Sequence, residues 1–126
     1  MTAYAANPRV AAYKQQSVLT ATPGQLVVML YDGARRFLFQ ASSAMREGEV
    51  VVAHQRLRRA EDILSELLAT LDHERGGDIA SHLQGIYVFC LAELNKARVE
   101  QEADKIDWVH GQLSELREAW AQIAGA

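Results

Sequence analysis

Residues 22–47 read TPGQLVVMLYDGARRFLFQASSAMRE, a run with both a helix start signal and a long helical repeat. Thr22 can cap free backbone N–H groups, and Pro23 at the first helical position loses no needed donor. Apolar residues then recur every three or four positions, which places them on one helix face. They are Leu26, Leu30, Ala34, Phe37, Ala41 and Ala44. Because Gly48 is a stop signal, we predict a helix over 23–47.

Two further segments repeat this pattern on either side of a glycine pair. The second helix is predicted over about 50–73, before the break at Gly76-Gly77. Its core stripe is Ala53, Leu57, Ala60, Leu64, Leu67 and Leu71. The third helix is predicted to start at Asp78, which favours a positive helix end, and to run to about residue 99. Its core stripe is Ile79, Leu83, Ile86, Cys90, Leu94 and Ala97.

A fourth helix follows the polar connection 100–102 and closes near Gly125. Its core stripe is Ile106, Val109, Leu113, Leu116, Trp120 and Ile123. Short loops force sequential helices to run in opposite directions. The sequence therefore predicts an all-α fold, an antiparallel up-down four-helix bundle with a short N-terminal arm.

The arm and the bundle divide the chain at residue 21. We assign 1–21 to the N-terminal arm and 22–126 to the bundle domain. Asn7-Pro8 can open a short helix carrying Val10 and Tyr13 on one side, but two turns are too few to be stable alone. The arm is therefore expected to dock on the bundle, to pair with a partner or to stay mobile.

Composition excludes several classes of protein. The 126 residues are 49% apolar and 23% charged, which predicts one domain with a real core and excludes a disordered chain. The net charge of −3 gives no electrostatic footprint for nucleic acid or an anionic membrane. No apolar run approaches the ~20 residues of a membrane span, and the first ten residues lack the apolar run of a secretory signal. We expect a cytoplasmic protein without membrane insertion.

The sequence contains no residue set that builds an active site. A di-metal bundle needs Glu-x-x-His pairs, and none occurs. Cys90 falls within the third stripe, where a small buried thiol is usual. Arg56, Arg58 and Arg59 form a basic cluster beside acidic residues, which favours a solvated face over a nucleic-acid contact. We predict a protein that is not an enzyme and has no metal or cofactor.

Several large apolar residues fall outside the predicted core stripes. Single exposed apolar residues are normal on any helix, so the prediction rests on the whole set. Such a surplus on several helices indicates a groove that receives another apolar helix. The set is Val28 and Phe39 on the first helix, Ile63 and Leu68 on the second, Val88 and Phe89 on the third, and Trp108 on the fourth.

Four segments, in this order, cover nearly the whole chain. They are YKQQSV at 13–18, ATPGQLVVMLYDG at 21–33, LDHERGGDIASHL at 71–83 with Tyr87, and AWAQI at 119–123. Together they resemble the flagellin-specific export chaperone family of bacterial flagellar secretion, the FliS type. The resemblance implies a cytoplasmic helical bundle, not an enzyme, that binds the disordered carboxyl-terminal segment of flagellin.

In such a family the chaperone prevents premature polymerisation of flagellin and delivers it to the flagellar type III export gate. The resemblance also implies that Val10 and Tyr13 take part in docking to the cytoplasmic domain of that gate. The surplus apolar residues are then our candidates for the flagellin groove, and the free chaperone is expected to be a monomer or weak dimer. The alternative is a self-associating structural bundle without a flagellin client, which would use the same apolar residues for homo-oligomerisation.

Overall fold

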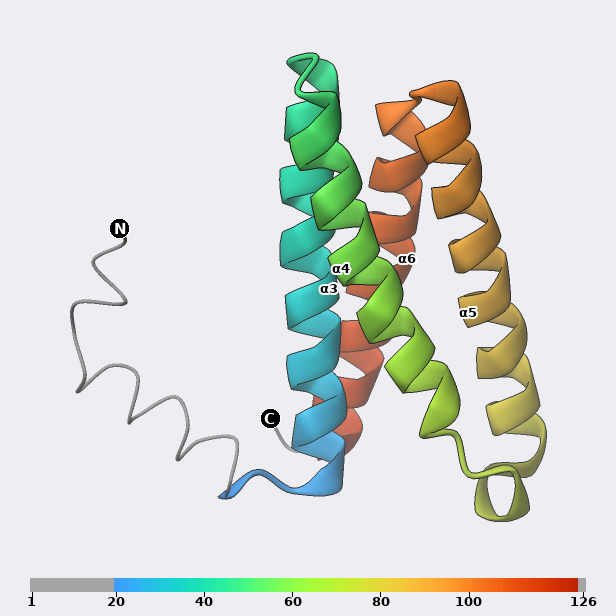
Figure 1. The fold of residues 1–126 in the computed structure, drawn as a ribbon. Helices are drawn as coiled ribbons and strands as arrows, with labels where there is room; N and C mark the ends of the chain where they lie inside the picture. The colour runs from blue at the N-terminus through green and yellow to red at the C-terminus, as the bar shows by residue number, and fades with distance from the viewer. Residues whose placement is uncertain (1–19, 125–126) are drawn as a thin grey trace.

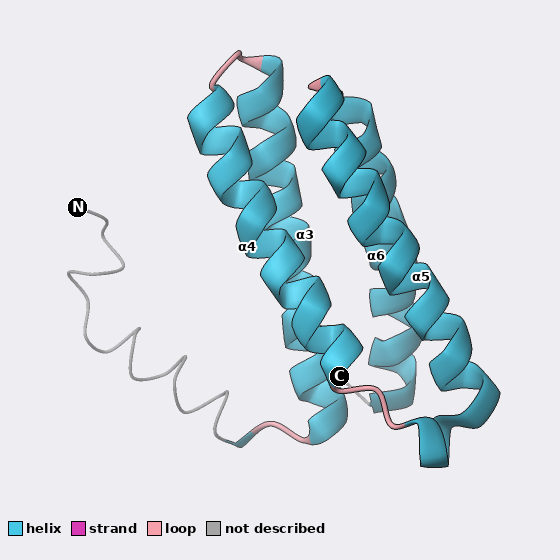
Figure 2. Ribbon diagram, turned by 45° about the vertical axis from the view of Figure 1, so that its right-hand side comes forward, coloured by secondary structure: helices cyan, strands magenta, loops and turns pink. Residues whose placement is uncertain are grey.

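The computed structural model describes residues 20–124, and this part of the chain contains four α-helices and no strand. They are α3 (Pro23–Arg46), α4 (Val50–Ala69), α5 (His73–Glu100) and α6 (Ala103–Ala124). The helices alternate in direction, and each packs against its neighbours in a ring, with α3 diagonally opposite α5 (Figures 1 and 2). The predicted all-α, antiparallel four-helix bundle is confirmed. Val10 and Tyr13 lie outside the described residues.

The start of α3 has the predicted cap. The Thr22 hydroxyl accepts a hydrogen bond from the Gln25 backbone N–H at 3.2 Å, and the Thr22 N–H donates to the Gln25 side chain at 2.9 Å. This reciprocal pair satisfies two backbone donors that no helical carbonyl can reach. At the other end, Gly48 has a φ of +77° in the turn before α4. The predicted first helix is therefore confirmed to within one residue.

The junction between α4 and α5 differs from the prediction. The second helix ends at Ala69 rather than near residue 73, and α5 begins at His73 rather than at Asp78. Asp72 caps this start, because its carboxylate accepts hydrogen bonds from the two backbone N–H groups of residues 74 and 75. Gly77 then interrupts the helix with φ +49° and ψ −122°, a conformation that favours glycine. The predicted break is real, but one helical turn precedes it.

Most predicted stripe residues are buried or pack against the core, but three are exposed. Leu26 is 39% exposed, Ile79 71% and Ile123 79%. All three lie at the same end of the bundle, where α3 and α5 begin and α6 ends. Periodicity places them on the correct face of each helix, but none of the four described helices extends far enough to cover them.

The two halves of the ring pack differently. The α3 helix approaches α4 and α6 closely, whereas α5 makes fewer contacts with its neighbours. Small residues allow the close approach, since a Cβ added at Gly33 would lie 3.3 Å from Cδ1 of Ile63. The larger side chains of Leu83 and Tyr87 face the core from α5. This asymmetry places the α5 backbone farther from its neighbours than that of α3, while the core residues of α5 stay buried.

We predict opposite stability effects for alanine at two glycines. Gly77→Ala should lower the free energy of unfolding by about 1–3 kcal/mol, because its φ and ψ are strained for a residue with a Cβ. Gly111→Ala should raise it by about 0.5–1 kcal/mol, since this α6 position is helical and has open space around it. Urea unfolding measures both, and unchanged stability of Gly77→Ala would contradict the kink.

Candidate functional site

The described chain offers apolar surface rather than reactive groups. Within residues 20–124 no group of three or more His, Cys, Asp or Glu side chains is placed to hold a metal ion. None of the helices there has the length and apolar character needed to cross a membrane. Cys90 is fully buried, and burial raises the pKa of its thiol to about 11. The thiol is therefore protonated at neutral pH and out of reach of a substrate.

An apolar hollow of about 360 Å³, the end groove, opens at the end of the bundle where α3 and α5 begin. All four helices contribute to it. Its apolar lining is Val27, Leu67, Leu71, Ile79, Ala80, Leu83, Tyr87 and Trp120. Asp72 and Arg75 also line it and are mainly exposed, so charge is confined to its rim. A groove of this composition binds an apolar segment flanked by polar groups.

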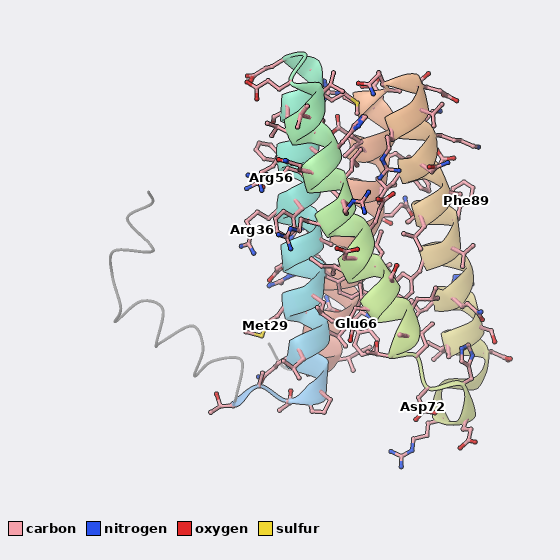
Figure 3. All side chains as sticks on the ribbon, viewed as in Figure 1. Met29, Arg36, Arg56, Glu66, Asp72 and Phe89 are labelled. Carbon is pink, nitrogen blue, oxygen red and sulfur yellow. The ribbon has the colours of Figure 1, made fainter. Side chains whose placement is uncertain are left out.

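A second hollow, the α3–α4 channel, continues from the end groove. It measures about 520 Å³ and shares Val27 and Thr70 with the end groove. Leu26 and Met29 line it and are 39% and 37% exposed. Figure 3 shows Met29 and Glu66 toward the lower end of the α3–α4 pair. The two hollows form one apolar surface beside the point where the chain enters α3.

This surface exists because of the chain's path around Gly77. Helix α4 ends at Ala69, and the segment to Gly77 extends beyond the end of α4 in Figure 1 before the regular part of α5 begins. Among residues 20–124, no helix therefore covers the lower ends of the apolar stripes of α3 and α5. Sequence reasoning missed this surface because it assigned Leu26 and Ile79 to the core. The available signal was their position at helix ends next to a glycine break.

A separate aromatic surface, the α5–α6 patch, is formed by Val88, Phe89 and Trp108. Their exposed fractions are 50%, 52% and 44%. The Phe89 and Trp108 rings meet edge to face with centroids 5.3 Å apart, and Phe89 points away from the bundle in Figure 3. The prediction that these three lie outside the core is confirmed. The pair shields part of each ring and leaves the rest available to a partner.

The other predicted groove residues do not join this patch. Phe39 is 65% exposed on α3 and lies outside the core as predicted. Val28 is only 4% exposed, so the prediction that it lies outside the core is wrong. The reason is that α3 packs against both α4 and α6, which buries a wider arc than one stripe. Ile63 and Leu68 are half-buried and pack against the core.

The face between α3 and α6 is closed by polar contacts. Arg46 bonds Asp104 and Asp107 at 2.7 Å each, and Arg117 bonds Asp32 at 3.0 Å. Burial alone would raise the pKa of Asp107, but hydrogen bonds from Arg46 and Ser42 hold it below its usual value. These charges neutralise each other within the fold, so this face offers little to an apolar partner.

Comparison with known proteins covers almost the whole chain. The family described as "Flagellar protein FliS" matches residues 5–126. The flagellar secretion chaperone FliS of Salmonella typhimurium is 38% identical over 120 residues, which cover 91% of this chain and 89% of that protein. The Vibrio cholerae protein of the same name is 36% identical over 116 residues, covering 89% and 85%. The Bacillus subtilis protein is 32% identical over 111 residues, covering 88% and 82%.

We predict that Cys90 is inert in the folded protein. At pH 8 a thiol with its raised pKa holds about two orders of magnitude less thiolate than a free cysteine, and burial blocks the reagent as well. A thiol-reactive chromogenic disulfide should therefore label the native chain at least ~100-fold more slowly than the urea-unfolded chain. The signal has one source, since the chain has one cysteine. Equal rates in both states would contradict the burial.

Proposed function

Because the chain belongs to the FliS family of flagellar secretion chaperones, which are not enzymes, we propose that its apolar surfaces bind the disordered carboxyl-terminal segment of flagellin. Binding covers a segment that would otherwise polymerise too early and keeps the subunit ready for export. The observation that carries the proposal is the continuous apolar surface formed by the end groove and the α3–α4 channel. Such a surface fits the apolar face of an amphipathic helix.

A disordered client suits two apolar surfaces that lie apart. One part of the segment folds into the end groove, and another reaches the α5–α6 patch, because a flexible chain can wrap a small bundle. Phe39 is a further single contact on α3. Coupled folding of this kind buries roughly 1,000–3,000 Å² and loses about 2–5 kcal/mol or more to ordering. That loss favours release of flagellin during export.

We also propose that the N-terminal arm delivers the client through Val10 and Tyr13, which contact the cytoplasmic domain of the export gate. Family membership supports this role. The arm joins the bundle at Thr22, next to Pro23 of the α3–α4 channel. Flagellin seated in the channel therefore lies beside the point where the arm joins the bundle. This role places the protein in the cytosol as a monomer or weak dimer.

We predict that a charge in the apolar lining of the end groove weakens binding of the client. Ile79→Asp should weaken binding of a synthetic flagellin carboxyl-terminal peptide more than 10-fold, because it places a carboxylate in an apolar contact. Stability should change by less than about 1 kcal/mol, since Ile79 is 71% exposed. Trp108→Ala should weaken binding as well, through loss of an aromatic anchor. Titration calorimetry and urea unfolding measure these effects.

Val99→Asp is the matched control. Val99 is also an apolar residue of α5, is 74% exposed, and lines neither the end groove nor the α3–α4 channel. Its substitution should leave peptide binding within about twofold. Equal loss in both variants would show that the end groove is not the site. Concentration-dependent dimerisation that Ile79→Asp abolishes, without flagellin binding by the wild type, would favour the self-associating bundle.

We predict that Val10 and Tyr13 of the arm are needed for binding to the export gate but not for binding to flagellin. Val10→Ala combined with Tyr13→Ala should leave the chaperone–flagellin complex intact and reduce its binding to the gate's cytoplasmic domain at least ~10-fold, through loss of the two anchor side chains. Val18→Ala, another apolar truncation in the arm, serves as the control and should bind the gate domain normally. Surface plasmon resonance on preformed complexes makes the measurement. Normal gate binding by the double variant would remove these two residues from the role.

A further inference from the structure

Four arginines of the described chain differ from its other cations. Between residues 20 and 124, every Lys and Arg side chain forms an ion pair except Arg36, Arg56, Arg58 and Arg59. Arg36 lies on α3 and the other three lie on the first half of α4. Figure 3 shows Arg36 and Arg56 projecting from the same side of the α3–α4 pair. The unpaired positive charge is therefore concentrated in one region.

Three of these arginines line a single open hollow of about 740 Å³, the basic hollow. Arg98 reaches the same hollow from α5, but its charge is already paired with Glu61. Asp62 is the one carboxylate in the lining, and although it lies one turn after Arg58 no ion pair joins them. The hollow thus keeps a net positive charge in a chain whose net charge is −3. Guanidinium groups without an ion pair in the fold are available to bind carboxylates in bidentate geometry.

An apolar patch borders the arginines. Val50, Val51 and Val52 at the start of α4 are 45%, 70% and 37% exposed, and Val51 lines the basic hollow. A phosphate backbone gains nothing by covering valines, and it is repelled by an acidic chain. A protein segment with both acidic and apolar side chains matches both parts of the surface.

We propose that the basic hollow docks an acidic amphipathic segment of a second protein partner, distinct from the client in the end groove. The two sites are centred on different halves of α4, so that both can be filled together, and Arg59 of the basic hollow lies about 12 Å along the helix from Leu67 of the end groove. Carboxylates of the partner pair with Arg56, Arg58 and Arg59, and its apolar side chain covers Val51. The site therefore recognises a partner through charge and binds it alongside flagellin.

The test uses the full chain and three fluorescein-labelled probes. They are a 16-residue helical peptide of glutamate and leucine, the same peptide with glutamine for glutamate, and a 12-nucleotide oligouridylate. Anisotropy at low and physiological salt should show that the acidic peptide binds at least ~10-fold more tightly than the neutral peptide and more tightly than the RNA. Tighter binding of the RNA would assign the hollow to nucleic acid. Absence of acidic-peptide binding would overturn the proposal.

Matched variants locate the binding. Arg58→Glu with Arg59→Glu should weaken the acidic peptide at least ~10-fold, and Val51→Ser should weaken it several-fold. Lys96→Glu with Lys105→Glu makes the same change in net charge outside the hollow and should leave binding within about threefold. Circular dichroism checks that all variants fold. Equal loss in the two double variants would mean that only net charge matters and would overturn the proposal.

The same variants separate this site from flagellin binding. Arg58→Glu with Arg59→Glu should bind the flagellin peptide normally, and Ile79→Asp should bind the acidic peptide normally. Loss of both ligands in the arginine variant would show one shared site rather than two. If the wild type fails to bind the flagellin peptide but binds the acidic peptide, the proposed flagellin function is contradicted and the proposal for the basic hollow is supported.

Discussion

The hydrogen bond between the Tyr31 and Tyr87 hydroxyls joins the two helices that lie diagonally across the bundle. Both side chains are almost completely buried, so each hydroxyl needs a hydrogen-bond partner inside the core. The two hydroxyls are partners of each other. Burial raises the pKa of both phenols, which keeps them protonated. The rings are tilted at 51° with centroids 6.4 Å apart. Tyr87 also lines the end groove, so this contact connects the core to the candidate binding surface.

Around this contact α3 lies close to its two neighbours and α5 lies farther from its own. Small residues such as Gly33 let α3 approach its neighbours, whereas α5 carries larger side chains and begins with a kink at Gly77. The end groove and the α5–α6 patch both include α5. Under the proposed function, the client therefore binds beside the helix that lies farthest from its neighbours.

Charge divides the remaining surface. Between α3 and α6, Arg46 and Arg117 are held by aspartates of the partner helix, so that face is closed within the fold. On α4, Arg58 and Arg59 have no such partner and lie in the basic hollow. Guanidiniums of the same kind thus stabilise one face and remain available on another. What separates them is whether a neighbouring helix brings a carboxylate within reach.

Local signals in the sequence determined the helices and the class of protein. The Thr22-Pro23 start, the Gly48 stop and the three-four spacing act within one or two turns of backbone, so they can be read without a structure. The same local motifs indicated the family, and the apolar residues outside the predicted stripes indicated a surface that binds another helix. The exposure of Phe39, Phe89 and Trp108 also followed from their angle to the stripes.

Only the tertiary structure decided which apolar residues form the candidate binding surface. Val28 is buried because α3 has two neighbours, and Leu26 and Ile79 are exposed because no helix within residues 20–124 covers the end of their stripes. The pairing of Phe89 with Trp108, and of Tyr31 with Tyr87, joins positions far apart in sequence. Periodicity sets the angle of a side chain about its own helix axis. Burial depends on how many other helices lie there and where they end, which no single helix encodes.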